Sequence, residues 1–384
     1  MEDHLARAAG PAAHALLSAA VGGAEVLSRR VCQVHHRPGH STTATWEVGV
    51  RSGVGARVDV LGVRVGAGDL VPLVWRFPDD PDLPGLAAAT DERCTRELLD
   101  RCGVEPGPVE LRVRGYRPGR RAVVEVRTPA LRAFVKVVRP SAVAALAERH
   151  RLLGGAGVPV PPVLSAQADG RLLLAALTGT SLRARLREGA EPLPSGTDVL
   201  GLLALLPPAL LALPRRSSWT DDVHVHAAVT AGALPDESDR CRRLADGVRA
   251  AVTDDVEDEP VHGDLYDGQL LLTGGRISGL LDVDTAGPGR RADDLACLLG
   301  HAAVLAQTQP AVLDLAARWL ADLDPHVDPA DLRARTAGVL VSLATGPHRV
   351  QAAGWQDLAL ARLELAERWL AAARGGPAPV RSRG

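Results

Sequence analysis

Short apolar runs separated by glycine and proline turns fill residues 31–77, a pattern typical of β-strands. Strands are predicted there at residues 31–34, 42–50, 57–65 and 70–77. An alanine-rich amphipathic stretch at residues 1–20 predicts a helix before them, and residues 86–102 predict another after them. The beginning of the chain is therefore expected to be a β-rich subdomain with helices at both ends.

A second β-rich segment follows, and then the pattern changes to helices. Strands are predicted at residues 110–116, 122–127, 131–138, 163–164 and 171–177, with a helix from Ser141 to about Leu153. From residue 178 onward the chain is predicted to be mostly helical, apart from one hairpin at residues 270–283. The longest apolar run, residues 199–213, is broken by two prolines and is too short to span a bilayer, so it predicts buried helices.

That hairpin carries the clearest candidate chemistry of the chain. A polar His-Gly-Asp turn at residues 262–264 and Gln269 precede its first strand, and Asp282 and Asp284 are expected at alternate positions along the returning strand. Alternate positions point to one face, so the hairpin is expected to bring Asp264, Gln269 and Asp282 to one mouth. A carboxylate that accepts a hydroxyl proton beside two oxygen ligands for magnesium is what phosphoryl transfer requires.

Length, charge and cysteine usage exclude several classes of protein. The chain has 384 residues, enough for two or three packed subdomains, and a net charge of −2, which gives no electrostatic case for a nucleic-acid or membrane partner. Its five cysteines are scattered without metal-ligand or disulfide spacing, and its acidic N-terminus is unlike a signal peptide. These features predict a cytoplasmic protein and leave the oligomeric state open.

Lysine occurs once in the whole chain, at position 136 within the apolar strand 133–138, although arginine is abundant and asparagine is absent. A lysine that persists where arginine serves elsewhere indicates a need for a compact point charge that a planar guanidinium does not meet. The alternative is a surviving lysine without a role on a sheet face.

The hairpin motif resembles the catalytic loop of the aminoglycoside phosphotransferase and choline kinase-like family. The resemblance rests on the His-Gly-Asp turn, the hairpin, the Asp-Val-Asp at residues 282–284 and the Asp-Leu-Ala at residues 294–296, in this order. It implies an α+β, bilobal protein kinase-like fold with an antiparallel-sheet N-lobe and a mainly helical C-lobe. Maltokinase-like and glucosamine kinase-like phosphotransferases add an N-terminal cap, so the implied domains are a cap at 1–105, an N-lobe at 106–177 and a C-lobe at 178–384.

The same resemblance implies roles for the residues around the catalytic loop. Asp264 would orient and deprotonate the acceptor hydroxyl, and His262 would support its loop. Asp282 would hold Mg2+ together with Gln269, which replaces the asparagine of the family and carries its oxygen one methylene further out. Asp294 would brace the loop from the following helix.

On the nucleotide side, the resemblance implies an ATP site. Lys136 would bind the α- and β-phosphates, and Glu148 would pair with it. The alternative for Glu148 is an exposed helical acid. The backbone from Ala175 to Leu177 would be the hinge that meets adenine.

An Arg-Pro-Gly turn occurs twice, at residues 36–40 and at residues 116–121. By the resemblance, the second turn would cover the nucleotide phosphates, although it is not rich in glycine. Arg117, Arg120 and Arg121 either contact phosphate directly or are solvated turn residues, and both interpretations remain open. The repeat is either incidental, because Pro-Gly turns are common, or marks a cap that itself resembles the N-lobe.

Few residues bear on the acceptor. Asp284 is one candidate, and Arg349 is another because it lies in a polar interruption, residues 345–351, between two apolar helices; a solvated loop arginine is its alternative. The acidic run at residues 254–259 would favour a cationic acceptor if it lined the mouth, although most such runs are solvated. His224 and His226 would not face each other on a helix and predict no metal site.

The sequence therefore predicts an ATP- and Mg2+-dependent kinase that phosphorylates a hydroxyl of a small molecule, such as a sugar, an amino sugar or an aminoglycoside-like compound. Two alternatives remain open. One is a kinase that acts on a peptide or protein in a biosynthetic pathway. The other is a nucleotide-binding pseudokinase, in which Gln269 and the glycine-poor turn have ended turnover.

Overall fold

The computed structural model describes residues 4–53, 55–69, 71–105, 107–253 and 257–379 in two compact units. Unit 1 comprises Met1–Ala147, Val163–Ala176 and Pro347–Ala353, and unit 2 comprises Glu148–Pro162, Leu177–Gly346 and Gly354–Gly384. Part of the acidic run, residues 254–256, and the C-terminal tail, residues 380–384, lie outside the described residues. The division into three domains at residues 105 and 177 stays a prediction.

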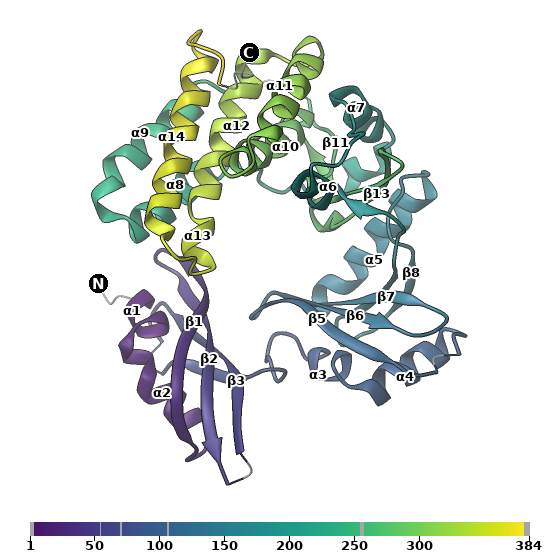
Figure 1. The fold of residues 1–384 in the computed structure, drawn as a ribbon, viewed down its shortest axis with the longest axis vertical. Coiled ribbons are helices and arrows are strands. Elements are labelled where there is room, and N and C mark those ends of the chain that lie inside the picture. Colours follow the sequence, from purple (N-terminus) through teal and green to yellow (C-terminus); the bar gives the residue numbers. More distant parts are fainter. Residues whose placement is uncertain (1–3, 54, 70, 106, 254–256, 380–384) are drawn as a thin grey trace. The chain divides into compact units, whose positions relative to one another are not determined.

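The first part of unit 1 is a four-stranded antiparallel sheet with short helices along it (Figure 1). In sheet order its strands are β1 (Glu25–Arg37), β2 (Ser41–Ser52), β3 (Gly55–Gly66) and β4 (Leu73–Arg76). The helix α1 (His4–Ala9), the 3-10 helix η1 (Pro11–Ala13) and α2 (His14–Ala20) bury Leu17 against Trp46 and Leu61 of the sheet. The predicted β-rich beginning with an N-terminal helix is confirmed, although β1 begins earlier than expected.

The second part of unit 1 is a five-stranded antiparallel sheet in the order β5-β6-β7-β9-β8. Its strands are β5 (Glu110–Arg117), β6 (Arg121–Arg127), β7 (Arg132–Val138), β8 (Val163–Ala166) and β9 (Arg171–Ala175). One face packs on α3 (Leu86–Ala89) and α4 (Glu92–Arg101), and the other packs on α5 (Pro140–Gly155). Because side chains alternate along β7, Val135 and Val137 point into the core between the sheet and the helices α3 and α4, whereas Lys136 lies on the face that packs on α5.

Two predictions about helices in unit 1 were wrong. Residues 86–102 form two helices rather than one. The first, α3, ends at Ala89, and Asp91 then caps the start of α4 by accepting a hydrogen bond from the Cys94 amide at 2.8 Å. Ser141 does not cap α5, which begins at Pro140, a residue well suited to the first turn because it lacks an amide proton.

Unit 2 is mainly helical and contains two small sheets (Figure 1). The sheets consist of β10 (Thr180–Ser181), β12 (Leu270–Thr273) and β13 (Arg276–Leu280), and of β11 (Glu259–Val261) paired with β14 (Gly287–Gly289). The helices are α6 (Leu182–Glu188), α7 (Gly196–Ala204), η2 (Pro208–Ala212), α8 (Val223–Ala233), η3 (Pro235–Glu237), α9 (Ser238–Arg249), η4 (Val283–Thr285), α10 (Arg291–Ala306), α11 (Ala311–Leu323), η5 (Asp324–His326), α12 (Pro329–Ala344) and α14 (Trp355–Ala373). The short helix α13 (Gly346–Arg349) lies almost wholly in unit 1.

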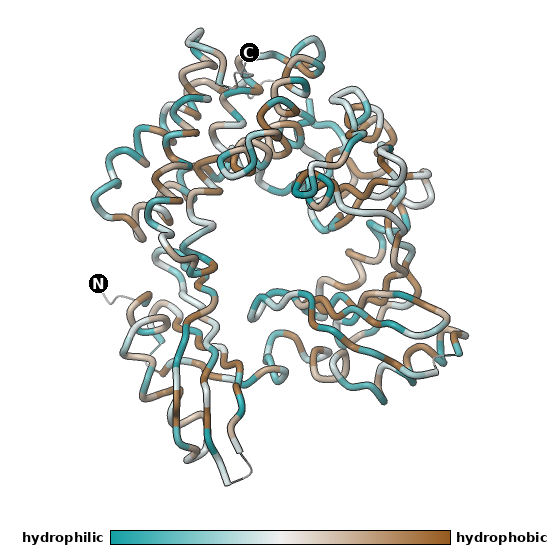
Figure 2. Tube along the Cα trace, in the orientation of Figure 1, coloured by the Kyte–Doolittle hydropathy of each residue, from teal (hydrophilic) through white to brown (hydrophobic). Residues whose placement is uncertain are grey.

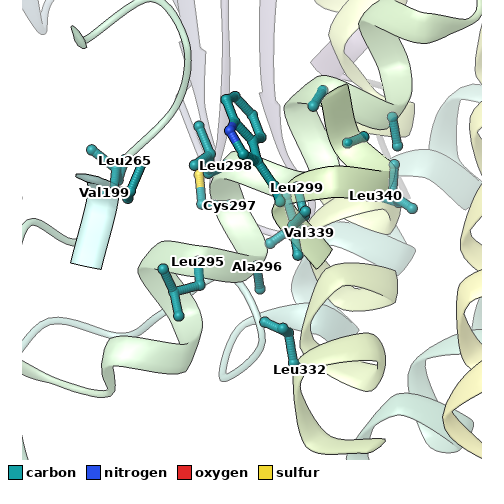
Figure 3. Close-up of a cluster of buried hydrophobic side chains, with 14 of the residues drawn as sticks. Val199, Leu265, Leu295, Ala296, Cys297, Leu298, Leu299, Leu332, Val339 and Leu340 are labelled. Carbon is teal, nitrogen blue, oxygen red and sulfur yellow. The ribbon is translucent and has the colours of Figure 1, made fainter. Parts of the chain in front are cut away.

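The core of unit 2 holds the β12–β13 hairpin, the candidate catalytic hairpin, in place. Leu295 and Leu299 of α10 are buried together with Leu340 of α12, in a cluster that also contains Leu265 (Figure 3). Leu265 and Leu295 directly follow Asp264 and Asp294, so a close-packed core anchors the backbone beside both acids. No helix in the described part of the chain is long and apolar enough to cross a membrane.

Candidate active site

His262 ties the catalytic loop to the segment that follows the hairpin. Its side chain is fully buried, its Nε2 lies 2.8 Å from the Leu281 carbonyl, and its Nδ1 accepts from the Asp264 amide at 3.3 Å. The Thr285 hydroxyl donates to the His262 carbonyl at 2.9 Å. A neutral imidazole with its proton on Nε2 satisfies both ring contacts, so His262 fixes the backbone from which Asp264 projects.

Asp294, in the first turn of α10, binds the backbone of the same loop. Its two carboxylate oxygens accept hydrogen bonds from the backbone amides of His262 and Gly263, each at 2.7 Å. Burial raises the pKa of Asp294 to about 7; the two amides lower it, while the charges of Asp293 and Asp264 raise it. The Asp294 carboxylate thus sets the geometry of the residues that precede Asp264.

The prediction that Asp282 and Asp284 share one face of a strand was wrong. The strand β13 ends at Leu280, Asp282 has left-handed backbone angles with φ 55°, and Asp284 lies in the 3-10 helix η4. A left-handed residue turns the chain sharply, and β14 can then pair with β11. A non-glycine residue in this conformation is uncommon, although aspartate adopts it more readily than most, and such residues cluster at functional sites.

Gln269 and Asp282, the two predicted metal ligands, lie side by side. The Gln269 side chain is buried, and its amide nitrogen is 3.4 Å from Asp282 Oδ2. A carboxylate and an amide carbonyl are hard oxygen donors of the kind Mg2+ prefers, and Mg2+ usually takes its remaining ligands from phosphate and water. The pair therefore fits a magnesium ion chemically, and its role stays a prediction.

Sequence reasoning missed a buried ion pair that supports the loop. Asp267 is fully buried, and Arg183 of α6 binds it through two hydrogen bonds of 2.6 and 3.1 Å. The Arg183 guanidinium also lies over the Tyr266 ring at 5.0 Å, and Tyr266 stacks on His301 at 4.4 Å. The acid within the motif was visible in the sequence, but nothing there indicated its partner 84 residues away.

A buried thiol also lies beside Asp264, the predicted catalytic acid. Cys297 Sγ is 3.8 Å from Asp264 Oδ1, and burial raises the pKa of this thiol well above its usual value, with Asp264 raising it further. Cys297 is therefore a neutral, weak hydrogen-bond donor to the Asp264 carboxylate. Its place directly after the Asp-Leu-Ala motif gave no sign of this contact.

A pocket within unit 2 adjoins the catalytic loop. Its lining includes Gly263 and Thr285, together with Arg215, Arg216, Trp219 and Arg290. Within the described part of the chain, the Trp219 indole Nε1 is buried without a hydrogen-bond partner. The indole nitrogen has almost no exposed surface, and the pocket volume of about 30 Å³ is that of one or two water molecules.

The predicted nucleotide residues lie mainly in unit 1. Lys136 is 6% exposed and pairs across the sheet with Leu172 of β9. Glu148, by contrast, is half-exposed and forms an ion pair with Arg151 at 3.0 Å. Its pairing with Lys136 stays a prediction.

The predicted hinge coincides with a boundary between the units. The strand β9 ends at Ala175, the Ala176 amide donates to the Arg132 carbonyl at 3.0 Å, and unit 2 resumes at Leu177. Contact between this backbone and adenine stays a prediction.

The arginine turn and Arg349 both belong to unit 1. Arg117 and Arg121 pair across the β5–β6 hairpin, and Gly119 takes the left-handed conformation that its tight turn requires. The charge of Arg349 acts on Arg120, so the two residues lie near each other.

In unit 2 the charge of Asp284 acts on the buried Arg149, whose Nε donates to the Ala286 carbonyl at 2.9 Å. The acceptor roles of Asp284 and Arg349 stay predictions.

The chain matches solved structures of the same fold. It resembles a thermostable mutant of the aminoglycoside phosphotransferase APH(4)-Ia in its apo form, with a TM-score of 0.51, 15% identity, and coverage of 72% of this chain and 98% of that one. A ternary complex of thermostable mutant APH(4)-Ia with ADP and hygromycin B has a TM-score of 0.52 and 15% identity, and the match covers 73% of this chain and 99% of that one. A ternary complex with AMP-PNP and hygromycin B has a TM-score of 0.50 and 15% identity, with the same coverage of 73% and 99%. A search of curated proteins found no match.

The sheet with Lys136 and the braced catalytic loop define a protein kinase-like phosphotransferase, which confirms the predicted fold class. The model of the phosphotransferase enzyme family, APH, matches residues 112–330, more than half of the chain. The chain belongs to this family. The predicted class, a small-molecule kinase with a hydroxyl acceptor, is thereby confirmed.

Proposed function

We propose that this protein transfers the γ-phosphoryl group of ATP, in the presence of Mg2+, to a hydroxyl of a small molecule such as a sugar, an amino sugar or an aminoglycoside-like compound. The observation that carries the proposal is the braced loop, in which His262 and Asp294 fix the backbone on both sides of Gly263 and so aim Asp264. Phosphoryl transfer depends mainly on positioning and charge, and a fixed carboxylate meets that need.

Each candidate residue has a task in this reaction. Asp264 accepts the proton of the acceptor hydroxyl while the hydroxyl oxygen attacks the γ-phosphorus, and the bond from that phosphorus to the bridging oxygen breaks, so that ADP leaves. Lys136 holds the nucleotide phosphates, and the Ala175 to Leu177 backbone receives the adenine. Asp282 and Gln269 would hold Mg2+, which, when bound, neutralises charge on the phosphates. Asp294 and His262 keep Asp264 in place.

Two findings support a nucleotide and a small acceptor. Similar structures contain ADP or AMP-PNP together with hygromycin B. The pocket beside Gly263 presents arginine side chains, and its volume of about 30 Å³ has room for one polar group of such an acceptor rather than for a whole sugar. All five cysteines are free, which supports a reducing, cytoplasmic compartment.

A panel of candidate acceptors tests the proposal. Mg2+-dependent ADP formation is measured with sugars, amino sugars, aminoglycosides and a peptide mixture, with wild type and Asp264→Asn compared throughout. Stimulation by one small-molecule class, lost in Asp264→Asn, is expected. Stimulation by peptides alone would favour a peptide kinase, and ATP binding without turnover would favour a pseudokinase.

A further inference from the structure

Arginines from three separate tips of unit 1 act electrostatically on one another or on His35, so they lie near one another. Arg37 ends β1 at the first Arg-Pro-Gly turn, the second such turn carries Arg117, Arg120 and Arg121, and Arg349 ends α13. The second turn appears as a hydrophilic end of the β5–β6 hairpin (Figure 2). The repeated turn in the sequence therefore has a structural counterpart in one cationic cluster.

Contacts between the two sheets hold this cluster together. The Gln33 amide of β1 donates to the Tyr116 carbonyl of β5 at 3.2 Å. His35 and Arg37 follow Gln33 at alternate positions of β1, so they lie on the face turned toward the second hairpin. The Tyr116 hydroxyl donates to Asp80 at 2.7 Å and accepts from the Trp75 indole at 2.8 Å, which fixes the turn end of the β5–β6 hairpin to residues 75–80.

The second turn uses its own backbone donors internally. The Gly119 amide donates to Asp80 Oδ2 at 2.7 Å, and the Arg120 amide donates to the Arg117 carbonyl at 3.0 Å. Arg139 Nε donates to the Gly119 carbonyl at 3.1 Å, which further fixes the tip. In a glycine-rich loop the backbone amides are free to face phosphate. Here two of them are occupied, so guanidinium side chains must supply the donors.

The electrostatics of the cluster favour an anionic ligand. Burial lowers the pKa of His35 to about 3, and the charges of Arg349, Arg120, Arg117 and Arg37 lower it further. Burial and the charges of Arg37, Arg121, Arg349 and Arg139 lower the pKa of Arg120 as well. Like charges held this closely repel one another, and an anion with several oxygens would relieve that repulsion.

We infer that Arg37, Arg120 and Arg349 form a phosphate-binding site in which the N-terminal cap and α13 complete the arginine turn of the N-lobe. Arginine suits this task because its planar fork binds phosphate oxygens in pairs. The phosphate belongs either to the nucleotide or to an acceptor that is already phosphorylated. This assignment rests on the proposed function for its role in catalysis, but the binding itself does not require turnover.

Binding of tripolyphosphate, ATP and glucose 6-phosphate to the full chain, measured by calorimetry without an acceptor reaction, tests the site. We expect Arg37→Gln and Arg349→Gln each to weaken binding of at least one of these anions by about tenfold, as loss of one charge-assisted contact does. The control Arg51→Gln removes an exposed arginine at the opposite end of the β1–β2 hairpin and should bind like wild type. Equal affinities in all four proteins would overturn the inference.

The source of the phosphate follows from competition. If the site holds the nucleotide, AMP-PNP should displace tripolyphosphate, and glucose 6-phosphate should bind no better than glucose. If it holds the acceptor, glucose 6-phosphate should bind to AMP-PNP-saturated protein, with Arg349→Gln and Arg37→Gln weakening it. Absence of binding by tripolyphosphate and glucose 6-phosphate, together with an ATP affinity that Arg37→Gln and Arg349→Gln leave unchanged, would contradict the inference, even if wild type phosphorylates a neutral sugar.

The ring of His35 provides a readout that is independent of activity. An anion beside the arginines offsets their charge, so saturation with the bound anion should raise the pKa of His35 from its low value, followed by NMR titration of its ring protons. Asp264→Asn should show the same rise, because it removes turnover and not the cluster. A His35 titration unchanged by the bound anion would place that anion elsewhere and contradict the inference.

Discussion

Two buried carboxylates have surroundings of opposite charge. Glu125 lies on β6 in the five-stranded sheet of unit 1, and Asp294 lies in the helix α10 of unit 2. Glu125 accepts hydrogen bonds from three arginines, Arg114, Arg127 and Arg132, at 2.7 to 2.9 Å. Asp294 accepts from two backbone amides, and the nearby charges of Asp264 and Asp293 are negative like its own. Burial raises the pKa of both acids, but the arginines bring that of Glu125 down to about 2, whereas that of Asp294 lies at about 7.

The difference separates an acid that cations neutralise from an acid that lies among like charges. Cations neutralise Glu125 within its own sheet, and its contribution is to stability. Asp294 instead lies near the like charges of Asp264 and Asp293, an arrangement that costs stability and is typical of functional sites. Replacements on the two sides should therefore separate activity from stability.

Asp264→Asn should have the largest effect on turnover. The substitution keeps the shape of the side chain but removes the proton acceptor, so kcat should fall by about 10²- to 10⁴-fold while nucleotide binding persists. Removing this charge also relieves repulsion of Asp294, so the free energy of unfolding at pH 8 should not decrease. Steady-state kinetics and urea unfolding check both, with Asp236→Asn, an exposed acid of unit 2, as control. Near-full activity would remove Asp264 from the catalytic role.

Lys136→Arg should have the next largest effect. Lys136 is almost fully buried on the face that packs against α5, and a guanidinium is bulkier and planar. We expect ATP affinity or kcat to fall by roughly tenfold, measured by calorimetry and kinetics, as misplacement of a phosphate-binding charge does. If both quantities equal those of wild type, the single lysine has no special role.

Gln269→Asn should lower activity by a smaller factor, on the order of a few-fold, because the shorter side chain leaves its oxygen short of the metal. The effect should shrink as Mg2+ is raised, which a magnesium titration of ADP formation measures. Higher activity would mean that asparagine restores the geometry of the family, and no change would show that Gln269 is not a ligand.

Glu125→Gln should have the smallest effect on turnover and a clear effect on stability. Loss of the charge weakens three charge-assisted hydrogen bonds, so unfolding at pH 7 should cost less free energy, by about 1–3 kcal/mol. A lowered pKa means that this stabilisation is present above pH 4.5 and disappears as the pH falls toward about 2. Urea unfolding at pH 7, 5 and 3 should therefore show wild type and Glu125→Gln converging at low pH, whereas the exposed control Glu110→Gln should match wild type throughout. A difference that persists undiminished at pH 3 would rule out this explanation.

The sequence predicted what depends on neighbouring residues. Glycine and proline turns delimited the strands, and the His-Gly-Asp motif located the loop because its spacing is local. The left-handed Asp282 was not predicted, since an aspartate carries no strict signal for positive φ. Arg183 as the partner of Asp267 and the inclusion of residues 347–353 in unit 1 depend on contacts between distant segments, which no local pattern encodes.

The central claim is that the loop around Asp264 carries out phosphoryl transfer. Its most direct test is to incubate wild type with ATP labelled on the γ-phosphate, the acceptor that best stimulates ADP formation, and Mg2+, and to follow the label into the acceptor. We predict labelled acceptor with wild type, none above background without Mg2+, and at least a hundredfold less with Asp264→Asn, as expected for loss of a general base. Tight ATP binding without any labelled acceptor, or equal labelling by wild type and Asp264→Asn, would contradict the account.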